Sequence, residues 1–245
     1  MRILCAVLVF LAMPAKADQP LVTDRPDFTE SAQVVPRGKI QVESGFTIER
    51  SGDARVQSWG EVLVRIPTDE RTEIRIGVPS YLRVQNGGSQ SGFDDGFLGF
   101  KRVLKKGEGS SPQVALLAGT TIPTGSRAVA ERKYQPEVVL AASLDLSPKL
   151  GLGANAGYAR ASSDGQRFGQ LFGSVALGYE LGERWGCYAE VFAFSRDEPG
   201  GSSREYFNAG VTYAVSDDFQ LDARLGRGLN DERERFWGIG ASRRF

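Results

Sequence analysis

From residue 38 to the C-terminus the chain alternates apolar and polar side chains with a period of two. Residues 39–49 are the clearest case, since Ile40, Val42, Phe46 and Ile48 fall on one side and charged or polar side chains fill most of the other. This periodicity is typical of a β-strand whose two faces meet different surroundings. No stretch of helical periodicity separates the alternating segments, so the pattern predicts an all-β chain.

Twelve such segments follow one another. We expect strands at residues 39–49, 55–66, 73–84, 95–105, 113–122, 137–146, 150–160, 170–180, 185–195, 206–215, 220–227 and 236–245. Each has about 17 residues of chain available, and a membrane-spanning strand needs roughly 9–11. Long polar connections (85–94, 124–135, 197–205) alternate with tight ones (67–72, 147–150, 181–184, 216–219), as outer loops and periplasmic turns do in transmembrane barrels.

The two faces of these strands can be assigned from energetics. Twelve strands close into a barrel too wide for side chains alone to fill as a dry core, and a charged side chain facing lipid at the midplane costs roughly 2–4 kcal/mol. Aromatic residues near segment ends suit an interfacial girdle: Tyr158, Tyr179, Trp185, Tyr213 and Trp237. We therefore predict a transmembrane antiparallel up-and-down β-barrel with its apolar face in lipid. A soluble, lipid-carrying barrel is the alternative.

The polar face then lines the lumen. The candidate lumen-lining residues are Glu43, Glu61, Arg65, Glu73, Arg75, Arg83, Asp95, Lys101, Glu137, Asp145, Glu180, Glu190, Asp222 and Arg224. These charges either pair with one another and stabilise the wall, or line a narrow polar path and select the solutes that pass. Both roles can hold for different members of the set.

One residue conflicts with this pattern. Pro79 lies inside the predicted strand 73–84, where it removes a backbone donor from the ladder, and a closed barrel has no free edge to accommodate it. A local β-bulge near Gly77 would reconcile the proline with the strand.

The N-terminus divides into two parts. Residues 1–17 have a basic start, an apolar run over 3–13 and the small-x-small triplet 15–17, which together predict a secretory signal peptide. Residues 18–37 do not alternate and precede the barrel domain, 38–245. This leader either lies loosely along the periplasmic mouth or folds inward as a partial plug. Its candidate plug residues are Asp24, Arg25 and Asp27, of which Arg25 and Asp27 would pair with lumen charges.

Composition excludes several classes of function. The apolar run 3–13 is shorter than the roughly 20 residues of a spanning helix. The chain has no histidine, which rules out His-dependent catalytic dyads, His metal sites and His-based pH switches. The mature chain, without Arg2 and Lys16, has net charge −2, and this lack of excess positive charge gives no indication of a nucleic-acid partner. It keeps only Cys187, so it forms no internal disulfide. We predict no enzyme activity, cofactor or metal.

Several motifs resemble one known family. They are Thr-Asp-Arg-Pro-Asp-Phe-Thr-Glu-Ser at 23–31, Gly-Lys-Ile-Gln-Val-Glu-Ser-Gly-Phe at 38–46, Arg-Ile-Gly-Val-Pro at 75–79, Phe-Asp-Asp-Gly at 93–96 and Pro-Thr-Gly at 123–125. The chain resembles the outer-membrane β-barrel "transporter" family labelled for the meta-pathway of phenol degradation. The resemblance implies a location in the outer membrane and a part in the uptake of small, often aromatic compounds.

The C-terminus resembles the signal that directs such barrels to the barrel-assembly machinery. Phe245 and Gly240 fit that signal, whereas Arg243 stands where an aromatic residue is usual. The expected partners are thus outer-membrane lipid, the assembly machinery and a small-molecule solute.

Two functions remain open at this point. The first is passive passage of small solutes, aromatic or hydrophobic ones among them, through the charged lumen. The second is a non-conducting structural or interaction barrel, closed by its own side chains and leader. A barrel hydrolase is disfavoured because the chain lacks the usual activating histidine.

Overall fold

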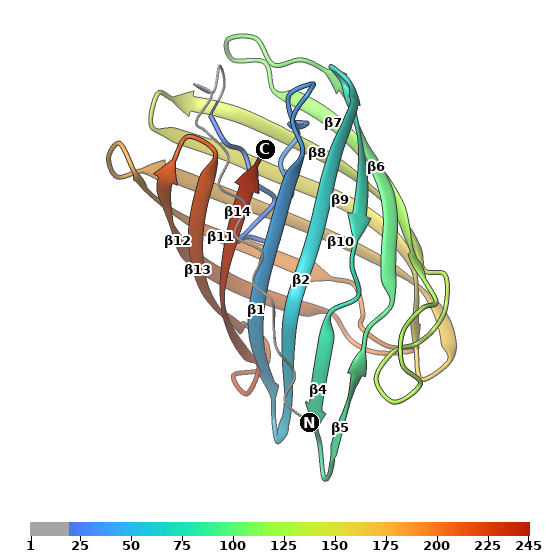
Figure 1. The fold of residues 1–245 in the computed structure, drawn as a ribbon. Coiled ribbons are helices and arrows are strands. Elements are labelled where there is room, and N and C mark those ends of the chain that lie inside the picture. The colour runs from blue at the N-terminus through green and yellow to red at the C-terminus, as the bar shows by residue number, and fades with distance from the viewer. Residues whose placement is uncertain (1–19) are drawn as a thin grey trace, which may run out of the picture.

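The alternating segments form the strands of one antiparallel sheet, which closes because β1 pairs with both β2 and β14 (Figure 1). The structure, a computed structural model, describes residues 20–245. The predicted signal peptide, 1–17, lies outside the described residues. No helix in the described part of the chain has the length and apolarity needed to cross a membrane.

Within residues 20–245, fourteen strands build this barrel. They are β1 (Gln41–Ser51), β2 (Ala54–Asp69), β3 (Thr72–Gly77), β4 (Tyr81–Gln85), β5 (Ser89–Phe93), β6 (Gly96–Lys105), β7 (Gln113–Ile122), β8 (Pro136–Ser147), β9 (Leu150–Ser163), β10 (Gln166–Glu180), β11 (Trp185–Phe194), β12 (Arg204–Ser216), β13 (Phe219–Gly228) and β14 (Arg235–Arg244). β3 and β4 both pair with β2 and act as one interrupted strand, and β5 and β6 make a second. The wall therefore has twelve strands, which confirms the predicted fold class.

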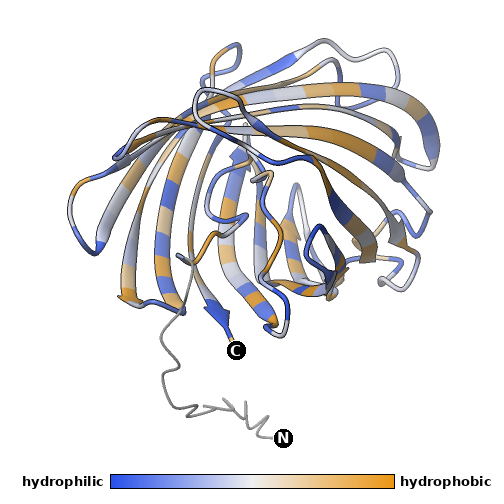
Figure 2. Ribbon diagram, turned by 90° about the horizontal axis from the view of Figure 1, so that it is seen from above, coloured by the Kyte–Doolittle hydropathy of each residue, from blue (hydrophilic) through white to orange (hydrophobic). Residues whose placement is uncertain are grey.

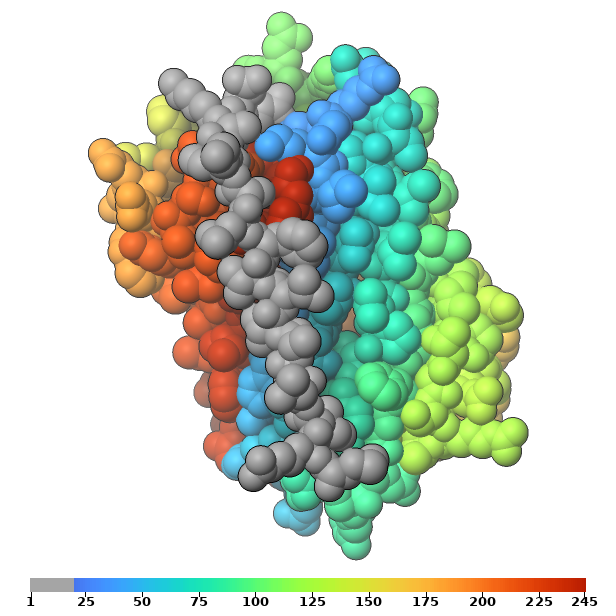
Figure 3. Space-filling model, in the orientation of Figure 1, coloured from blue at the N-terminus to red at the C-terminus, as the bar shows by residue number. Residues whose placement is uncertain are grey.

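One predicted connection was wrong. Residues 85–94 were expected as a long polar loop, but they contain β5, which pairs with β4 in a hairpin. Figures 1 and 3 show this hairpin projecting at the lower end of the molecule, the end to which the loop 123–135 also belongs. Polar side chains in that hairpin hid the strand from the apolar pattern.

The break at Pro79 is where the strand changes face. Pro79 lies between β3 and β4, and the amide of Val78 still donates to the carbonyl of Val62 at 2.9 Å. Opposite the break, β2 carries a bulge whose residues Gly60 and Glu61 have φ values of 102° and 42°. A bulge was expected beside Gly77, but it lies in the neighbouring strand instead, and the predicted 73–84 strand is interrupted at Pro79.

The polarity of the barrel is the reverse of a soluble protein. Leu171 and Leu225 are 61% and 64% exposed on the outer surface, whereas the largest fully buried side chains are those of Arg65 and Lys101. Figure 2 shows hydrophobic and hydrophilic residues alternating along the strands. Exposed aliphatic groups suit hydrocarbon, where a charged side chain would be costly. The apolar face points outward, as predicted.

Aromatic rings form a band on the outer face. Trp237, Phe46, Trp59, Tyr81 and Phe93 succeed one another across β14, β1, β2, β4 and β5, with neighbouring ring centroids 5.4–5.8 Å apart. Four of these rings are more than one-third exposed; Phe46 is more covered. Rings at one level on the outer wall are expected at a membrane interface.

Candidate functional site

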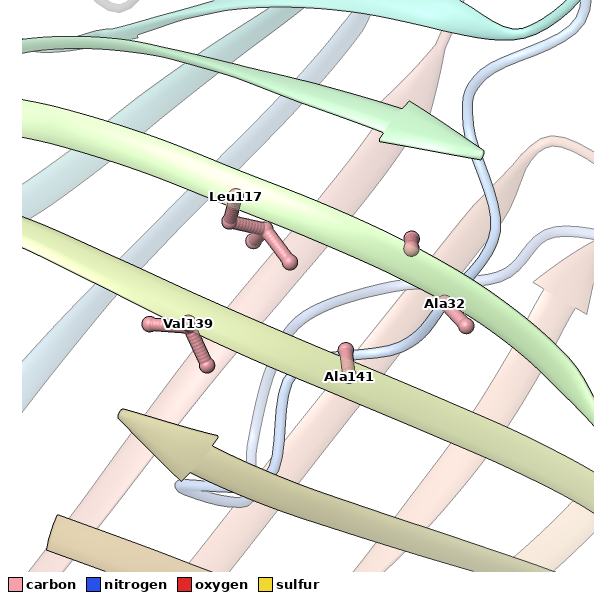
Figure 4. Packing of buried hydrophobic residues seen from close by; sticks show 5 residues of the cluster. Ala32, Leu117, Val139 and Ala141 are labelled. Carbon is pink, nitrogen blue, oxygen red and sulfur yellow. The ribbon is translucent and has the colours of Figure 1, made fainter. Parts of the chain in front are cut away.

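The leader lies inside the barrel. Residues 20–37 enter beside the tight turns, where the Pro20 carbonyl accepts a hydrogen bond from Arg244 Nη1 at 3.3 Å, and return to the start of β1 (Figure 1). Of the two arrangements considered for this segment, the structure has the inward fold. Ala32 packs in a small apolar cluster against Ala115 and Leu117 of β7 and Val139 and Ala141 of β8 (Figure 4).

Asp24 is the charged centre of the leader. Its carboxylate accepts hydrogen bonds from Lys101 Nζ at 2.9 Å and Arg75 Nη1 at 2.8 Å, and Arg65 Nη1 lies 3.2 Å away. Burial favours the neutral acid, but the positive charges of Arg65, Lys101 and Arg75 outweigh it and hold the pKa of Asp24 well below its usual value. The Ser31 amide also donates to this carboxylate, at 3.0 Å, which closes a turn of the leader. Asp24 is therefore ionised and fully engaged.

Two wall glutamates complete this cluster. Glu43 accepts from the Asp24 amide at 3.0 Å and lies 3.1 Å from Arg65 Nη1. Glu73 accepts from Arg65 Nε at 2.9 Å and from the Val35 amide at 2.8 Å. Solvent reaches almost none of these groups, and buried charges are tolerated only when paired and hydrogen-bonded in this way. The cluster thus fixes both limbs of the leader to the wall.

Arg25 contacts a different part of the wall. Its guanidinium forms an ion pair with Glu61 at 2.8 Å and a longer one with Asp222 at 3.4 Å, and it donates to the carbonyl of Ile239 at 3.2 Å. Beneath it lie Gly45 and Gly240, which face each other across β1 and β14. A Cβ on either glycine would overlap the guanidinium. The absence of side chains at these two positions leaves the space that the Arg25 guanidinium occupies, which we call the seat of Arg25.

Glu190 holds the tip of the leader. It accepts hydrogen bonds from the amides of Phe28 (2.7 Å) and Thr29 (3.0 Å) and from Asn208 Nδ2 (2.6 Å). The Thr29 hydroxyl lies 2.9 Å from the same carboxylate. Its oxygens are therefore satisfied without any cation. Beside it, Asn155 of β9 exchanges hydrogen bonds with the backbone of Glu30 at 2.7 and 3.0 Å.

The tip separates two cavities of the lumen. The outer one, about 330 Å³, is lined by Phe28 and by residues near the β1–β2 end such as Glu49. The inner one, about 590 Å³, is lined by Asp27 and by residues of the tight-turn end such as Lys149. The two share no lining residue, although Asp27 and Phe28 are neighbours in sequence. The leader thus divides the lumen.

Aromatic rings dominate the outer cavity. Phe28 stacks on Phe192 with centroids 4.6 Å apart, and Phe192 stacks on Tyr206 at 4.8 Å. Arg224 lies over the ring of Phe236, at 5.6 Å, and its buried Nε has no hydrogen-bond partner. The cavity therefore offers ring faces as its most distinctive lining.

The predicted lumen residues lie in different surroundings: most contact the leader, some line the inner cavity, and one anchors a loop. Those that contact the leader are Glu43, Glu61, Arg65, Glu73, Arg75, Lys101, Glu190, Asp222 and Arg224. Asp145 and Glu180 line the inner cavity, and Glu137 is half-buried on the inner side of β8. Asp95 accepts from the amides of Gly125 and Arg132 and so anchors the loop 123–135.

Arg83 is not in the lumen. Its exposed side chain lies two residues after Tyr81 in β4, on the side where the Tyr81 ring contacts Trp59 and Phe93. The interruption at Pro79 reverses which side chains face inward, so a face assigned by continuous alternation from Arg75 is inverted beyond it. The prediction for Arg83 is thus corrected.

The plug residues and the C-terminus are placed as follows. Asp24 and Arg25 form the ion pairs described above, whereas Asp27 lines the inner cavity and has no ion pair among residues 20–245. Phe245 closes the barrel by exchanging backbone hydrogen bonds with Ile40 at 2.8 and 3.1 Å. Its role in insertion stays a prediction, and Gly240 has the additional role of seating Arg25.

Sequence reasoning missed the neutral and aromatic members of the site. Asn155, Ser174 and Asn208 lie at inward positions of their strands, and continuing the face of Glu190 along β11 places Phe192 there as well. The available signal was position within the strand. The lumen candidates were restricted to charged residues, which left out the neutral polar ones, and apolar residues were assigned to lipid by chemical type, which left out Phe192.

Known structures with a similar fold come from the outer membrane. The COG4313 outer membrane channel from Pseudomonas putida F1 matches with a TM-score of 0.65 and 15% identity, over 87% of this chain and 98% of that one. The NanC porin matches with a TM-score of 0.58 and 11% identity (83% and 98%), and the KdgM porin with 0.55 and 9% (82% and 98%). No protein of curated function matches the sequence.

These likenesses show the fold, a closed β-barrel of the outer-membrane kind, and the apolar outer face of this barrel agrees with a location in the outer membrane. The family profile described as "Putative MetA-pathway of phenol degradation" matches residues 23–245. The match covers the leader from Thr23 onward and every strand of the barrel. The chain is therefore a member of that outer-membrane β-barrel family.

Proposed function

We propose that this barrel gives passive passage to small aromatic or hydrophobic solutes, with the lumen as the path and the leader as its constriction. The observation that carries the proposal is the ring-lined outer cavity, which ends on Phe28 of the leader and is followed by the inner cavity on the other side of the leader. A solute entering from outside meets ring faces first and must then pass the leader.

The outer cavity suits one small ring. Its volume of about 330 Å³ exceeds the roughly 150 Å³ that suffices to bind benzene in an engineered protein cavity. Stacked rings at 4.6–4.8 Å provide faces for a further aromatic group.

Single-channel recording of the purified protein in planar bilayers tests the proposal. We expect discrete conductance steps, and we expect an aromatic alcohol added on the outer side to reduce the current in a concentration-dependent way. The Phe192→Ala substitution should weaken that reduction about tenfold, because a ring face is lost. A cyclohexyl alcohol of similar size is the matched control solute. An absence of steps over many insertions would count against passage.

The second candidate is a non-conducting barrel that serves a structural or interaction role. The ion-paired leader favours it, because the leader spans the lumen between the two cavities. Deleting residues 18–31 separates the candidates. If the barrel is a channel constricted by the leader, it conducts weakly before the deletion and strongly after it. If it is a non-conducting barrel, it conducts only after the deletion.

Absence of catalysis and engagement of the assembly machinery remain proposals of the same kind. A hydrolase assay on phospholipid and ester substrates tests the first. Removal of Phe245 tests the second, since it removes the last ladder pairing with Ile40 and should lower the amount of folded barrel recovered from the outer membrane.

A further inference from the structure

We infer that Arg65, Arg75 and Lys101 form an anion-binding site of the lumen. Its resident ligand is the leader's own Asp24 carboxylate, and the site takes a carboxylate-bearing solute when Asp24 is withdrawn. This inference needs only the wall and the leader, and it holds whether or not aromatic solutes pass.

The site is built as a carboxylate receptor. Lys101 Nζ lies 2.9 Å from both oxygens of Asp24, Arg75 Nη1 lies 2.8 Å from one of them, and Arg65 Nη1 lies 3.2 Å from the same one. The three cations come from β2, β3 and β6, adjacent strands of a rigid wall. Their side chains are at most 5% exposed. Charge-assisted hydrogen bonds from fixed, desolvated donors are the strong kind.

The wall alone does not neutralise these cations. Glu43 and Glu73 are its two carboxylates in the cluster, and both are committed to Arg65, at 3.1 and 2.9 Å. Glu73 lies 3.9 Å from both Arg75 and Lys101, too far for a hydrogen bond.

The carboxylate that pairs with Arg75 at 2.6 Å is Glu30, which belongs to the leader. Glu137 of β8 makes no ion pair with the cluster in the part of the chain described. Withdrawing the leader therefore leaves Arg75 and Lys101 on the lumen wall without a carboxylate at hydrogen-bonding distance.

Three converging cations with two wall carboxylates leave an excess of positive charge, so an anion should replace Asp24. A carboxylate fits best, because the donors already converge on the two oxygens of one carboxylate. Solute binding and leader withdrawal are then linked: each favours the other by the same factor. The leader acts as a tethered competitor of an anionic solute.

Chemical rescue in the full-length protein tests this. In Asp24→Ala we expect sodium acetate to raise the unfolding temperature toward that of the unsubstituted protein, at constant ionic strength, and to bind at least about tenfold more tightly than to the unsubstituted protein. Acetamide, which is neutral and nearly the same shape, should have no effect. Asp27→Ala is the matched variant, because Asp27 is a leader carboxylate without an ion pair in the structure, and acetate should not rescue it.

A second measurement covers the case in which Asp24→Ala fails to fold. The reversal potential of the barrel lacking residues 18–31 should move toward anion selectivity, and Lys101→Met in that background should move it back. The inference is overturned if acetate and acetamide act alike on Asp24→Ala, or if the shortened barrel shows no such shift. Neither result depends on an aromatic solute, so failure here is distinct from failure of the proposed passage.

Discussion

On the side of β2, β3 and β6 the leader is held by ion pairs between side chains that solvent barely reaches, with Asp24 at their centre. On the side of β10, β11 and β12 it is held by hydrogen bonds to the single carboxylate of Glu190 and by the stacking of Phe28 on Phe192. The first contact is made of charges and the second of rings and neutral donors. Only the second borders a cavity with open ring faces.

The difference separates two tasks. Buried ion pairs tolerate little displacement, because removing one partner leaves the other charged and desolvated. Ring contacts are worth only about 0.5–1.5 kcal/mol beyond their buried area, and they tolerate sliding and exchange. We therefore assign the fixing of the leader to the charged side and the contact with solutes to the ring side. The following changes test that division.

The largest effect is expected from Asp24. Replacing it by alanine removes the anion shared by Arg65, Arg75 and Lys101, and breaking a buried pair costs about 3–5 kcal/mol. The leader should leave its seat, and single-channel conductance should rise toward that of the barrel lacking residues 18–31. Asp24→Glu keeps the charge and should retain most of the closure. If conductance is unchanged in Asp24→Ala, the charged side does not fix the leader.

A smaller effect is expected from Gly240. A methyl group there would overlap the guanidinium of Arg25, and overpacking costs about 1–3 kcal/mol. Gly240→Ala should displace Arg25 from Glu61 and Asp222 and raise the conductance partway. Gly178→Ala is the matched control, because a Cβ at that position meets nothing within 4 Å. Equal conductance changes in the two variants would show that the seat of Arg25 is unimportant.

The next effect depends on pH, and it lowers the conductance, whereas the first two substitutions raise it. Burial raises the pKa of Asp27, and the negative charge of Glu190 raises it further. Because that pKa is higher with the leader docked than in water, ionisation of Asp27 disfavours docking as pH rises through it, and protonation favours docking as pH falls. The pKa of Asp24 is shifted the other way, so its ion pairs persist down to about pH 4.

Lowering the pH from 8 to 5 should therefore close the protein further, and conductance should fall. The Asp27→Asn protein, which cannot ionise at that position, should show a low conductance that changes less with pH. Recording both proteins at fixed ionic strength measures this. Conductance that instead rises on acidification would contradict the assignment.

The sequence was sufficient for the barrel because the period-two pattern and the cost of charge in lipid act on every strand independently. The sequence was insufficient where a local irregularity of a strand changes which face the following side chains occupy. The interruption at Pro79 and the bulge at Gly60–Glu61 reverse the faces of β4 and of the first part of β2, and nothing in residues 81–85 alone reveals this. The inward rings of Phe192 and Tyr206 were hidden for another reason, since an apolar side chain satisfies either lipid or a solute cavity.

Arg83 gives the smallest effect and the sharpest test of that reversal. It was predicted to face the lumen with Arg75, but the structure puts it on the outer side of an extracellular hairpin, exposed, with one long hydrogen bond of 3.4 Å to Ser89. Arg83→Gln should leave conductance and ion selectivity unchanged, because a solvated surface charge is screened. Arg75→Gln removes a cation from the Asp24 site and should raise conductance clearly. If the two substitutions have equal effects, then the alternation of inward and outward side chains continues from β3 into β4 without a reversal at Pro79. Arg83 would then face the lumen, as Arg75 does.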